Sequence, residues 1–289
     1  MKVPSILSRR SVPPMTKIWQ AQRQDELPLD ETHMVRSAVN AASTSNTAPG
    51  ILVSGQSSEC RIARSERGVC KAGSRVRVEE SRALKFAHSL QLPVPAVHEV
   101  NASGQQTEIL MDFVDGECLE EAWLSMNSEQ KRSVAEQIGH IVTTMRQAAS
   151  DQCSIGAFGG PARDCRQISD YSGGPFANEA EFNTFVLDLL RGTPSLIRST
   201  LAEALNVDSQ IVLTHGDLTP RNIIVKGDRV QALLDWEYAG WYPEYWEYMK
   251  FFDRPTDCKD WKDYAEIIFG TQYPKQLLTF QAMARWQKP

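Results

Sequence analysis

The segment THGDLTPRNIIV, residues 214–225, carries the side chains best suited to a chemical role. Asp217 and Asn222 stand five residues apart across a loop that contains Pro220, and an apolar strand follows directly. After a hairpin, the sequence LLDWE places Asp235 at the end of the second strand. Phosphoryl transfer needs a carboxylate at the attacking hydroxyl and oxygen ligands for magnesium. The spacing predicts such a site, with the loop carboxylate at the substrate and the other two side chains at the metal.

Each of these residues also has a purely structural interpretation. Asp217 is a possible turn former or helix cap, Asn222 a turn residue, Asp235 a strand-end cap, and His215 a core histidine bonded to the backbone. The combined pattern H-G-D-x-x-x-x-N, hairpin, L-L-D also requires strands on both sides, and apolar runs supply them. The joint pattern therefore favours the functional interpretation.

These motifs resemble those of a known family. HGDLTPRNIIV and LLDWEYAGWYPEYWEY are similar to the catalytic loop and metal-binding segment of the aminoglycoside phosphotransferase family, especially its fungal members, and more distantly to those of choline kinases and protein kinases. MDFVDGECLEEAW resembles the interlobe hinge, and the likeness covers roughly residues 60 to 255. It implies a two-lobed, protein-kinase-like fold with ATP in the cleft. By the same resemblance Asp217 is the catalytic base, Asn222 and Asp235 are Mg²⁺ ligands, and His215 braces the loop.

The resemblance also nominates a nucleotide-binding cation in the first lobe. GVCKAG followed by VRVEESRALKF resembles the strand lysine and helix glutamate of the family. This implies that Lys71 binds the α and β phosphates of ATP and that Glu80 is its ion-pair partner, with Glu79 as the competing choice. The alternative is a surface lysine and a glutamate stabilised at a helix start by the helix dipole.

The hinge-like segment implies the position of the adenine. Backbone groups of Met111 to Val114, including Phe113, would carry the base, as the hinge does in the family. The loop that covers the phosphates departs from the kinase pattern, because no G-x-G-x-x-G precedes the lysine strand and serines and a glutamine occupy the expected turn at residues 54–58. This departure keeps a second hypothesis open, a pseudokinase that acts as a nucleotide-binding or scaffolding module.

Short strands and one helix must position the lysine. The runs ILVS, RIA, GVCKAG, AVHEV and EILMDFV are rich in β-branched and apolar residues between Gly, Ser and Asn breaks. Between them, VEESRALKFAHSL predicts a helix whose buried stripe is formed by Ala83, Leu84, Ala87 and Leu90. The first part of the chain is therefore expected to be mostly β.

Helical periodicity dominates after Gly116. SEQKRSVAEQIGHIVTTMRQAA repeats apolar residues at a period of 3.6, and NEAEFNTFVLDLLRG does the same, with Asn178 and Glu181 at capping-box spacing and Gly192 at the expected end. The period returns to two at residues 211–235, where a hairpin turns at Lys226, Gly227 and Asp228, and helical patterns fill the rest of the chain.

These patterns predict an α+β fold with a small, mostly β N-lobe and a larger, mostly α C-lobe. We expect an N-terminal extension over residues 1–48, an N-lobe with the lysine and hinge over 49–115, and a C-lobe with the catalytic loop and metal-binding segment over 116–289. The extension is expected to be disordered or a linker, because residues 37–50 are small, mostly polar and uncharged.

Composition narrows the class of partner. The 289 residues include 31 basic and 36 acidic side chains, so the basic footprint of nucleic-acid binding is not expected. Six cysteines lack CxxC pairs and favour reduced thiols, and no apolar run is long enough to span a membrane. We expect a cytoplasmic protein. The alternative is a mitochondrial one, because basic and serine residues interleave before Asp25, as in a presequence.

The acceptor is the least determined part of the prediction. The segment after Asp235 is dense in aromatic and acidic residues, which would suit a cationic amine such as an aminoglycoside or choline. The alternative places the aromatic side chains in the core, and a neutral hydroxylated metabolite then remains equally open. A protein substrate is a poor third hypothesis, because no activation segment with an A-P-E-like end follows.

Overall fold

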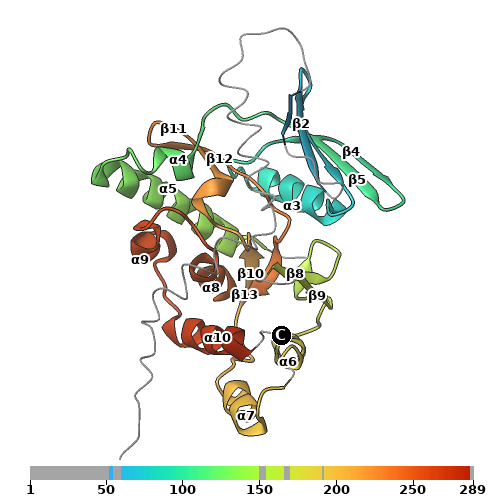
Figure 1. Ribbon diagram of the computed structural model, residues 1–289, viewed down its shortest axis with the longest axis vertical. Helices are drawn as coiled ribbons and strands as arrows, with labels where there is room; N and C mark the ends of the chain where they lie inside the picture. The colour runs from blue at the N-terminus through green and yellow to red at the C-terminus, as the bar shows by residue number, and fades with distance from the viewer. Residues whose placement is uncertain (1–51, 55–59, 150–153, 166–169, 191, 287–289) are drawn as a thin grey trace, which may run out of the picture.

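A five-stranded antiparallel sheet begins the described part of the chain (Figure 1). The computed structural model describes residues 52–54, 60–149, 154–165, 170–190 and 192–286. The strands run in the order β1-β2-β3-β5-β4 and are β1 (Leu52–Ser54), β2 (Arg61–Ser65), β3 (Gly68–Gly73), β4 (Val97–Ser103) and β5 (Gln106–Met111). All five predicted strands are thereby confirmed.

One helix, α3 (Val78–Ser89), packs with this sheet, and the sequence pattern predicted it. Ala83, Leu84 and Ala87 are buried in the same hydrophobic core as Ile62 and Ile109 of the sheet. The predicted extension over residues 1–48 and most of the predicted turn at 54–58 lie outside the described residues.

Helices are the most abundant regular structure in the described residues after residue 118 (Figure 1). They are α4 (Leu119–Ala122), α5 (Ser128–Gln147), α6 (Glu179–Asp188), α7 (Ser195–Glu203), α8 (Trp246–Asp253), α9 (Ala265–Phe269) and α10 (Pro274–Trp286). Asn178 caps α6 by accepting a hydrogen bond from the Glu181 backbone at 2.9 Å, at the predicted position. The helix ends at Asp188 with Leu189 as its C-cap, so the prediction that Gly192 ends it is wrong, although the φ of Gly192, 84°, is left-handed.

The hairpin at the centre of the helical part is confirmed. Strands β11 (Ile223–Lys226) and β12 (Arg229–Leu233) pair antiparallel, and Gly227 turns the chain with a φ of 61°. Strand β6 (Glu117–Cys118) adds to the other side of β11. The short 3₁₀ turn η1 (Pro220–Asn222) leads directly into β11 and so connects the segment that carries Asp217 to this sheet.

The expectation that helices fill the chain beyond residue 235 is wrong in one place. Residues 240–243 form strand β13 (Gly240–Pro243), which pairs with β10 (Ile211–Thr214) and with β7 (Gly156–Ala157). The approach is so close that a Cβ on Gly240 would lie 2.3 Å from the Gly156 carbonyl oxygen, a contact that only glycine permits. Strands β8 (Ala162–Cys165) and β9 (Asp170–Gly173) were likewise not predicted.

The aromatic residues that follow Asp235 lie in the core. Each of them is less than 9% exposed: Trp236, Tyr238, Trp241, Tyr242, Tyr245, Trp246 and Tyr248. Tyr242 stacks on Trp246 with ring centroids 5.6 Å apart, and Trp246 meets Phe182 of α6 edge to face at 5.0 Å. Their burial is what the second interpretation of this segment predicted.

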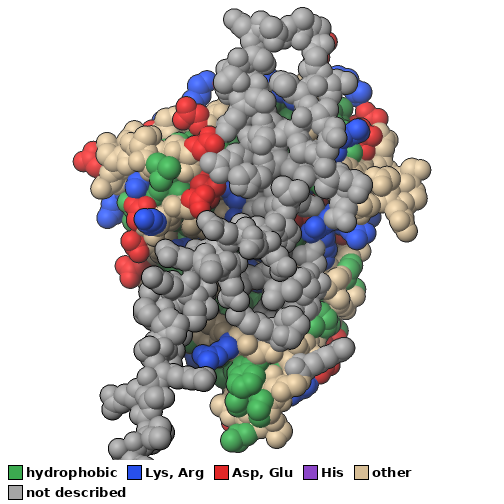
Figure 2. Space-filling view, in the orientation of Figure 1, with side chains coloured by type: hydrophobic (Ala, Val, Ile, Leu, Met, Phe, Trp, Pro, Cys, Tyr) green, Lys and Arg blue, Asp and Glu red, His purple; other side chains and the backbone are tan. Residues whose placement is uncertain are grey.

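The described surface mixes charges of both signs. Figure 2 shows acidic and basic side chains interspersed on this face, with hydrophobic side chains gathered over α7. Among the described residues, no helix combines the length and the apolar character that crossing a bilayer requires.

The close contact between β3 and the end of β5 generates a stability prediction. Gly68 has a φ of 124°, and a Cβ there would lie 2.3 Å from the Met111 carbonyl oxygen. We expect Gly68→Ala to lower the free energy of unfolding by about 3 kcal/mol or more, because backbone strain and overlap add. Gly104→Ala is the matched control, since its φ is 60° but nothing lies within 4 Å. It should cost only about 1 kcal/mol. Equal losses in urea unfolding would contradict the role of this contact.

Candidate active site

A buried lysine joins the sheet to the helix and to the hairpin segment. Lys71 of β3 is 5% exposed, and its Nζ lies 3.0 Å from Glu80 Oε1 of α3 and 3.0 Å from Asp235 Oδ1. Burial opposes the charged amine, but the facing carboxylates of Asp235, Glu80 and Glu237 outweigh it and raise the lysine pKa well above its ordinary value. Of the two glutamates considered at the helix start, the structure brings Glu80 to the lysine.

Asn222 and Asp235 emerge side by side. The Leu234 backbone N–H donates to the Asn222 carbonyl at 2.7 Å, so the chain carrying Asp235 runs alongside the end of η1. Asp235 lies two residues beyond β12 in a left-handed conformation, with a φ of 61°, which redirects its side chain. This arrangement brings the two predicted metal ligands to the same end of the hairpin.

An unpaired oxygen atom tests whether these residues fit a magnesium ion. The Oδ1 atom of Asn222 is buried and accepts no hydrogen bond from the described residues. Its amide nitrogen is already committed, because Nδ2 donates to Asp217 Oδ2 at 2.8 Å and thereby turns Oδ1 the other way. Buried acceptors are costly without a partner. An amide oxygen beside the Asp235 carboxylate is a ligand set that suits Mg²⁺.

Cations surround the carboxylate of Asp217. Arg221 Nη2 lies 3.2 Å from Oδ1 and 3.3 Å from Oδ2, and Arg254 Nε lies 3.3 Å from Oδ1. Burial opposes ionisation, but Arg254, Arg221 and the hydrogen bond from Asn222 outweigh it and hold the pKa of Asp217 below its ordinary value. The group is therefore a carboxylate at neutral pH and is held in one orientation from several sides.

His215 braces the loop through both ring nitrogens. Its Nδ1 accepts the Asp217 backbone N–H at 3.2 Å, and its Nε2 lies 2.9 Å from the Leu234 carbonyl oxygen. Burial lowers the pKa of the imidazole, so the neutral tautomer with the proton on Nε2 satisfies both contacts. The ring thus ties the Asp217 loop to the segment that carries Asp235.

The predicted hinge lines a pocket beside Lys71. The pocket contains about 610 Å³ of empty space, part of which is open to solvent. Apolar side chains form most of its wall, with the lysine network at one end: Ile62, Val69, Lys71, Glu80, Leu84, Pro95, Met111, Asp112, Phe113, Val114, Leu234 and Asp235. All the residues predicted to bind nucleotide, and one of the two predicted metal ligands, therefore share one pocket.

A buried glutamate that no sequence motif identified holds the backbone at the start of the Asp217 loop. Glu247 of α8 accepts the backbone N–H groups of His215 and Gly216, the latter at 3.2 Å. Burial raises the pKa of this carboxyl to about 7, against the opposing effect of the two N–H donors. Its signal in the sequence was one acid among several in an aromatic segment, which did not distinguish it.

Two further residues near Asp217 were missed. Arg254, which follows α8, donates to the Gly216 carbonyl oxygen at 3.1 Å and lies 4.6 Å from the Tyr238 ring. Lys262 of η2 (Trp261–Tyr264) donates to the Arg254 carbonyl oxygen at 3.0 Å. Both residues come from a part of the chain with no recognisable motif, so no local pattern identified them.

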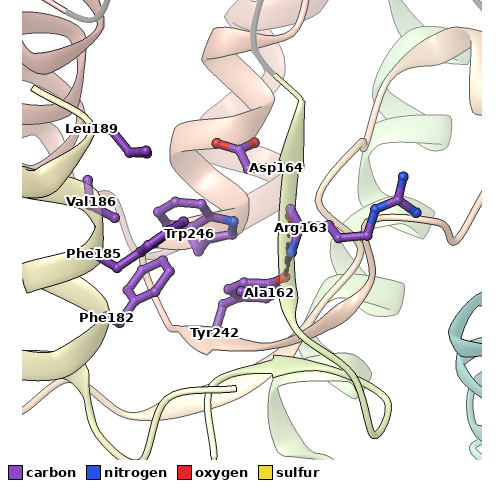
Figure 3. Close-up of a pocket in the computed structure, with 9 residues that line it drawn as sticks. All are labelled: Ala162, Arg163, Asp164, Phe182, Phe185, Val186, Leu189, Tyr242 and Trp246. Carbon is purple, nitrogen blue, oxygen red and sulfur yellow. Dashed lines mark hydrogen bonds between the residues drawn. The ribbon is translucent and has the colours of Figure 1, made fainter. Parts of the chain in front are cut away.

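A second pocket lies between β8, α6 and α8 (Figure 3). Its empty space is about 280 Å³, and its lining is mostly aromatic and aliphatic: Ala162, Arg163, Asp164, Phe182, Phe185, Val186, Leu189, Tyr242 and Trp246. Figure 3 shows Arg163 pointing away from the aromatic rings. Asp164 Oδ1 lies 2.6 Å from Lys250 Nζ. None of the predicted site residues lies here.

Comparison with known sequences matches most of the chain to one family. The sequence profile of the phosphotransferase enzyme family (APH) matches residues 69–271. This range begins in β3 and includes all the residues that the sequence analysis nominated. No curated protein sequence matches the chain significantly.

Solved structures share the fold. A thermostable mutant of aminoglycoside phosphotransferase APH(4)-Ia, in ternary complex with ADP and hygromycin B, matches with a TM-score of 0.60 at 16% identity, covering 86% of this chain and 89% of that chain. Aminoglycoside-3'-phosphotransferase of type VIII matches with a TM-score of 0.54 at 14% identity, covering 89% and 99%. The streptomycin-ATP-APH(2")-IIa ternary complex gives 0.53 at 14%, covering 91% and 87%. The predicted α+β, protein-kinase-like fold is confirmed.

The buried glutamate generates a pH prediction. The pKa of Glu247, about 7, lies above the ordinary value of 4.5, so the folded protein holds this proton more tightly than the unfolded chain does. The associated stability is fully present below pH 4.5 and is lost as the pH rises to about 7. We expect the free energy of unfolding of the wild type, relative to Glu247→Gln, to fall by on the order of 3 kcal/mol across this window.

Urea unfolding of both proteins at several pH values checks this expectation. Glu203→Gln, at the exposed end of α7, is the control and should leave the pH profile unchanged. A constant difference between the wild type and Glu247→Gln would show that the Glu247 proton is not linked to folding.

Proposed function

Because the chain belongs to the phosphotransferase enzyme family, we propose that it is an ATP-dependent kinase that transfers the γ-phosphate to a hydroxyl group of a small molecule. The single observation that carries this proposal is the buried Lys71, held at 3.0 Å by both Glu80 and Asp235 at one end of a pocket whose other side is the hinge segment. A cation fixed in this way is what nucleotide phosphates require.

The nucleotide would lie along the first pocket. We propose that its adenine contacts the Met111 to Val114 segment and that its α and β phosphates contact Lys71. Glu80 positions the amine and keeps it charged. Asn222 and Asp235 would hold Mg²⁺, which supplies positive charge to the phosphate oxygens as negative charge shifts among them. The nucleotide-bound relatives, one with ADP and one with ATP, support the choice of nucleotide.

At the acceptor end, Asp217 would orient the attacking hydroxyl. Its low pKa makes it a weak proton acceptor, but phosphoryl transfer through a loose transition state needs positioning more than strong base catalysis. The hydroxyl would donate its hydrogen bond to the carboxylate, and the proton would move there late in the transfer. His215 and Glu247 contribute by fixing the backbone of the same loop.

The lysine assignment predicts nucleotide-dependent stabilisation. Millimolar Mg-ATP should raise the melting temperature of the wild type, because a ligand at 100 times its dissociation constant adds roughly 2.7 kcal/mol. Lys71→Ala should reduce this shift strongly, measured against its own nucleotide-free melting temperature. Lys85→Ala, on an exposed position of α3, is the matched control and should keep the full shift. An equal shift in Lys71→Ala would remove the lysine from the nucleotide site.

The two aspartates should separate turnover from nucleotide binding. Asp217→Asn should cut turnover by about a hundredfold or more with Mg-ATP affinity nearly unchanged, because the hydroxyl loses its carboxylate while Lys71 and Asp235 are left in place. Asp235→Asn should weaken Mg-ATP binding as well as turnover, because an anionic ligand becomes neutral.

Both variants would be measured for ADP release and for Mg-ATP thermal shift under identical conditions. Wild-type turnover in Asp217→Asn would refute the assignment of the acceptor carboxylate. A wild type that binds Mg-ATP but releases no ADP with any hydroxylated compound would instead favour the pseudokinase hypothesis.

A further inference from the structure

The amine of Lys262, a cation near Asp217, is not explained by binding of the nucleotide or the metal. Lys262 of η2 is partly buried, and among the described residues no carboxylate is close enough to form a salt bridge with its amine. Its one hydrogen bond goes to the Arg254 carbonyl oxygen, and the amine also lies 4.5 Å from the centre of the Phe251 ring. An ammonium group has three donors. Two of them are thus available for a ligand.

Lys250 shows how the same part of the fold pairs a buried lysine when the role is structural. Its side chain is 3% exposed, and Nζ lies 2.6 Å from Asp164 Oδ1 and 2.9 Å from Asp253 Oδ2. Two carboxylates therefore compensate this amine, as expected of a buried ion. Lys262 is partly buried and has no carboxylate within salt-bridge distance among the described residues, so its charge can pair with that of an anionic ligand.

Charged groups of the Asp217 loop, of η1, of α8 and of the residue after α8 act electrostatically on the Lys262 amine. Arg221 of η1 and Arg254 after α8 repel its charge, whereas Asp217 and Asp253 attract it. Burial and the Arg221 charge lower the pKa of Lys262 to about 8, so most of the amine is still protonated at neutral pH. Both aspartates are already engaged, Asp217 by the two arginines and Asp253 by Lys250. The surroundings of the amine therefore favour an anionic ligand.

We propose that Lys262 binds an anionic group of the phosphate acceptor, a carboxylate or a phosphate ester, while the acceptor hydroxyl meets Asp217. This inference rests on the proposed kinase function and names the class of its substrate. A hydroxylated acid or a sugar phosphate fits this description. An acceptor whose charge comes only from amines, such as an aminoglycoside, would face Arg221, Arg254 and Lys262 together and is disfavoured.

The binding test uses inorganic phosphate and acetate as probes of the two anion types. Each is titrated calorimetrically into protein saturated with Mg-AMP-PNP, whose own binding is measured first. We expect at least one probe to bind the wild type and Lys259→Gln, a matched change of an exposed lysine. Lys262→Gln should weaken that binding about tenfold, and Lys262→Arg should retain most of it.

A turnover test uses three acceptors with one carbon skeleton: glycerate, glycerol and 3-amino-1,2-propanediol. ADP release should give the highest kcat/KM for the acid and the lowest for the amine, with about tenfold between the acid and the neutral triol. In Lys262→Gln this preference should largely disappear, whereas Lys259→Gln should preserve it.

Stability provides a readout that separates ligand binding from a structural role. Because Arg221 and Arg254 repel the charge of the partly buried Lys262 amine, Lys262→Gln should fold and melt no lower than the wild type. A clear fall in its melting temperature would indicate a structural lysine and overturn the proposal.

Other outcomes are equally decisive. Absence of phosphate and acetate binding, or equal binding in the wild type and Lys262→Gln, overturns the anion site even if Mg-AMP-PNP binds normally. Reduced Mg-AMP-PNP affinity in Lys262→Gln would assign the amine to the nucleotide and also overturn it. Failure of the wild type to bind Mg-AMP-PNP would refute the kinase function itself, which is a distinguishable result.

Discussion

The ion pairs of Lys71 are the constraint on which the rest of the structure depends. A buried ammonium group is tolerated only where carboxylates surround it, and here one carboxylate comes from α3 and the other from beyond β12. The strand and the helix that follows it must therefore meet, at one point, a segment that lies 164 residues beyond the lysine in the chain. Their common orientation is fixed by a charge that none of them could bury alone.

A second set of contacts makes the loop around Asp217 equally rigid. His215 joins its backbone to the segment before Asp235, and Glu247 accepts two N–H groups from its start. The loop is thus held by hydrogen bonds to groups on two other elements, β12's extension and α8. A carboxylate on such a loop loses little freedom when a ligand arrives, and this preorganisation is what positioning catalysis requires.

Local pattern and motif predicted much of this arrangement from the sequence. Strand and helix periodicity located the sheet, α3, α5 and the hairpin, because each buries one regular face. The spacing around Asp217 located the loop. Strand β13 was missed, since its residues are buried on both sides and carry no alternation. Glu247, Arg254 and Lys262 were missed for another reason. Their importance lies in contacts with residues distant in sequence, and no local pattern encodes such contacts.

The left-handed backbone at Asp235 has an evolutionary consequence. With a φ of 61°, the backbone at this position is readily adopted by glycine, asparagine and aspartate and is strained for most other residues. The backbone conformation therefore restricts which amino acids can replace Asp235 without loss of the fold. A lineage that loses selection for the charged oxygen can drift to asparagine or glycine with the fold intact, whereas glutamate, chemically the nearest replacement, meets a conformational barrier. Descendants of such a protein would fall into two groups, those keeping aspartate and those retaining the shape without the charge.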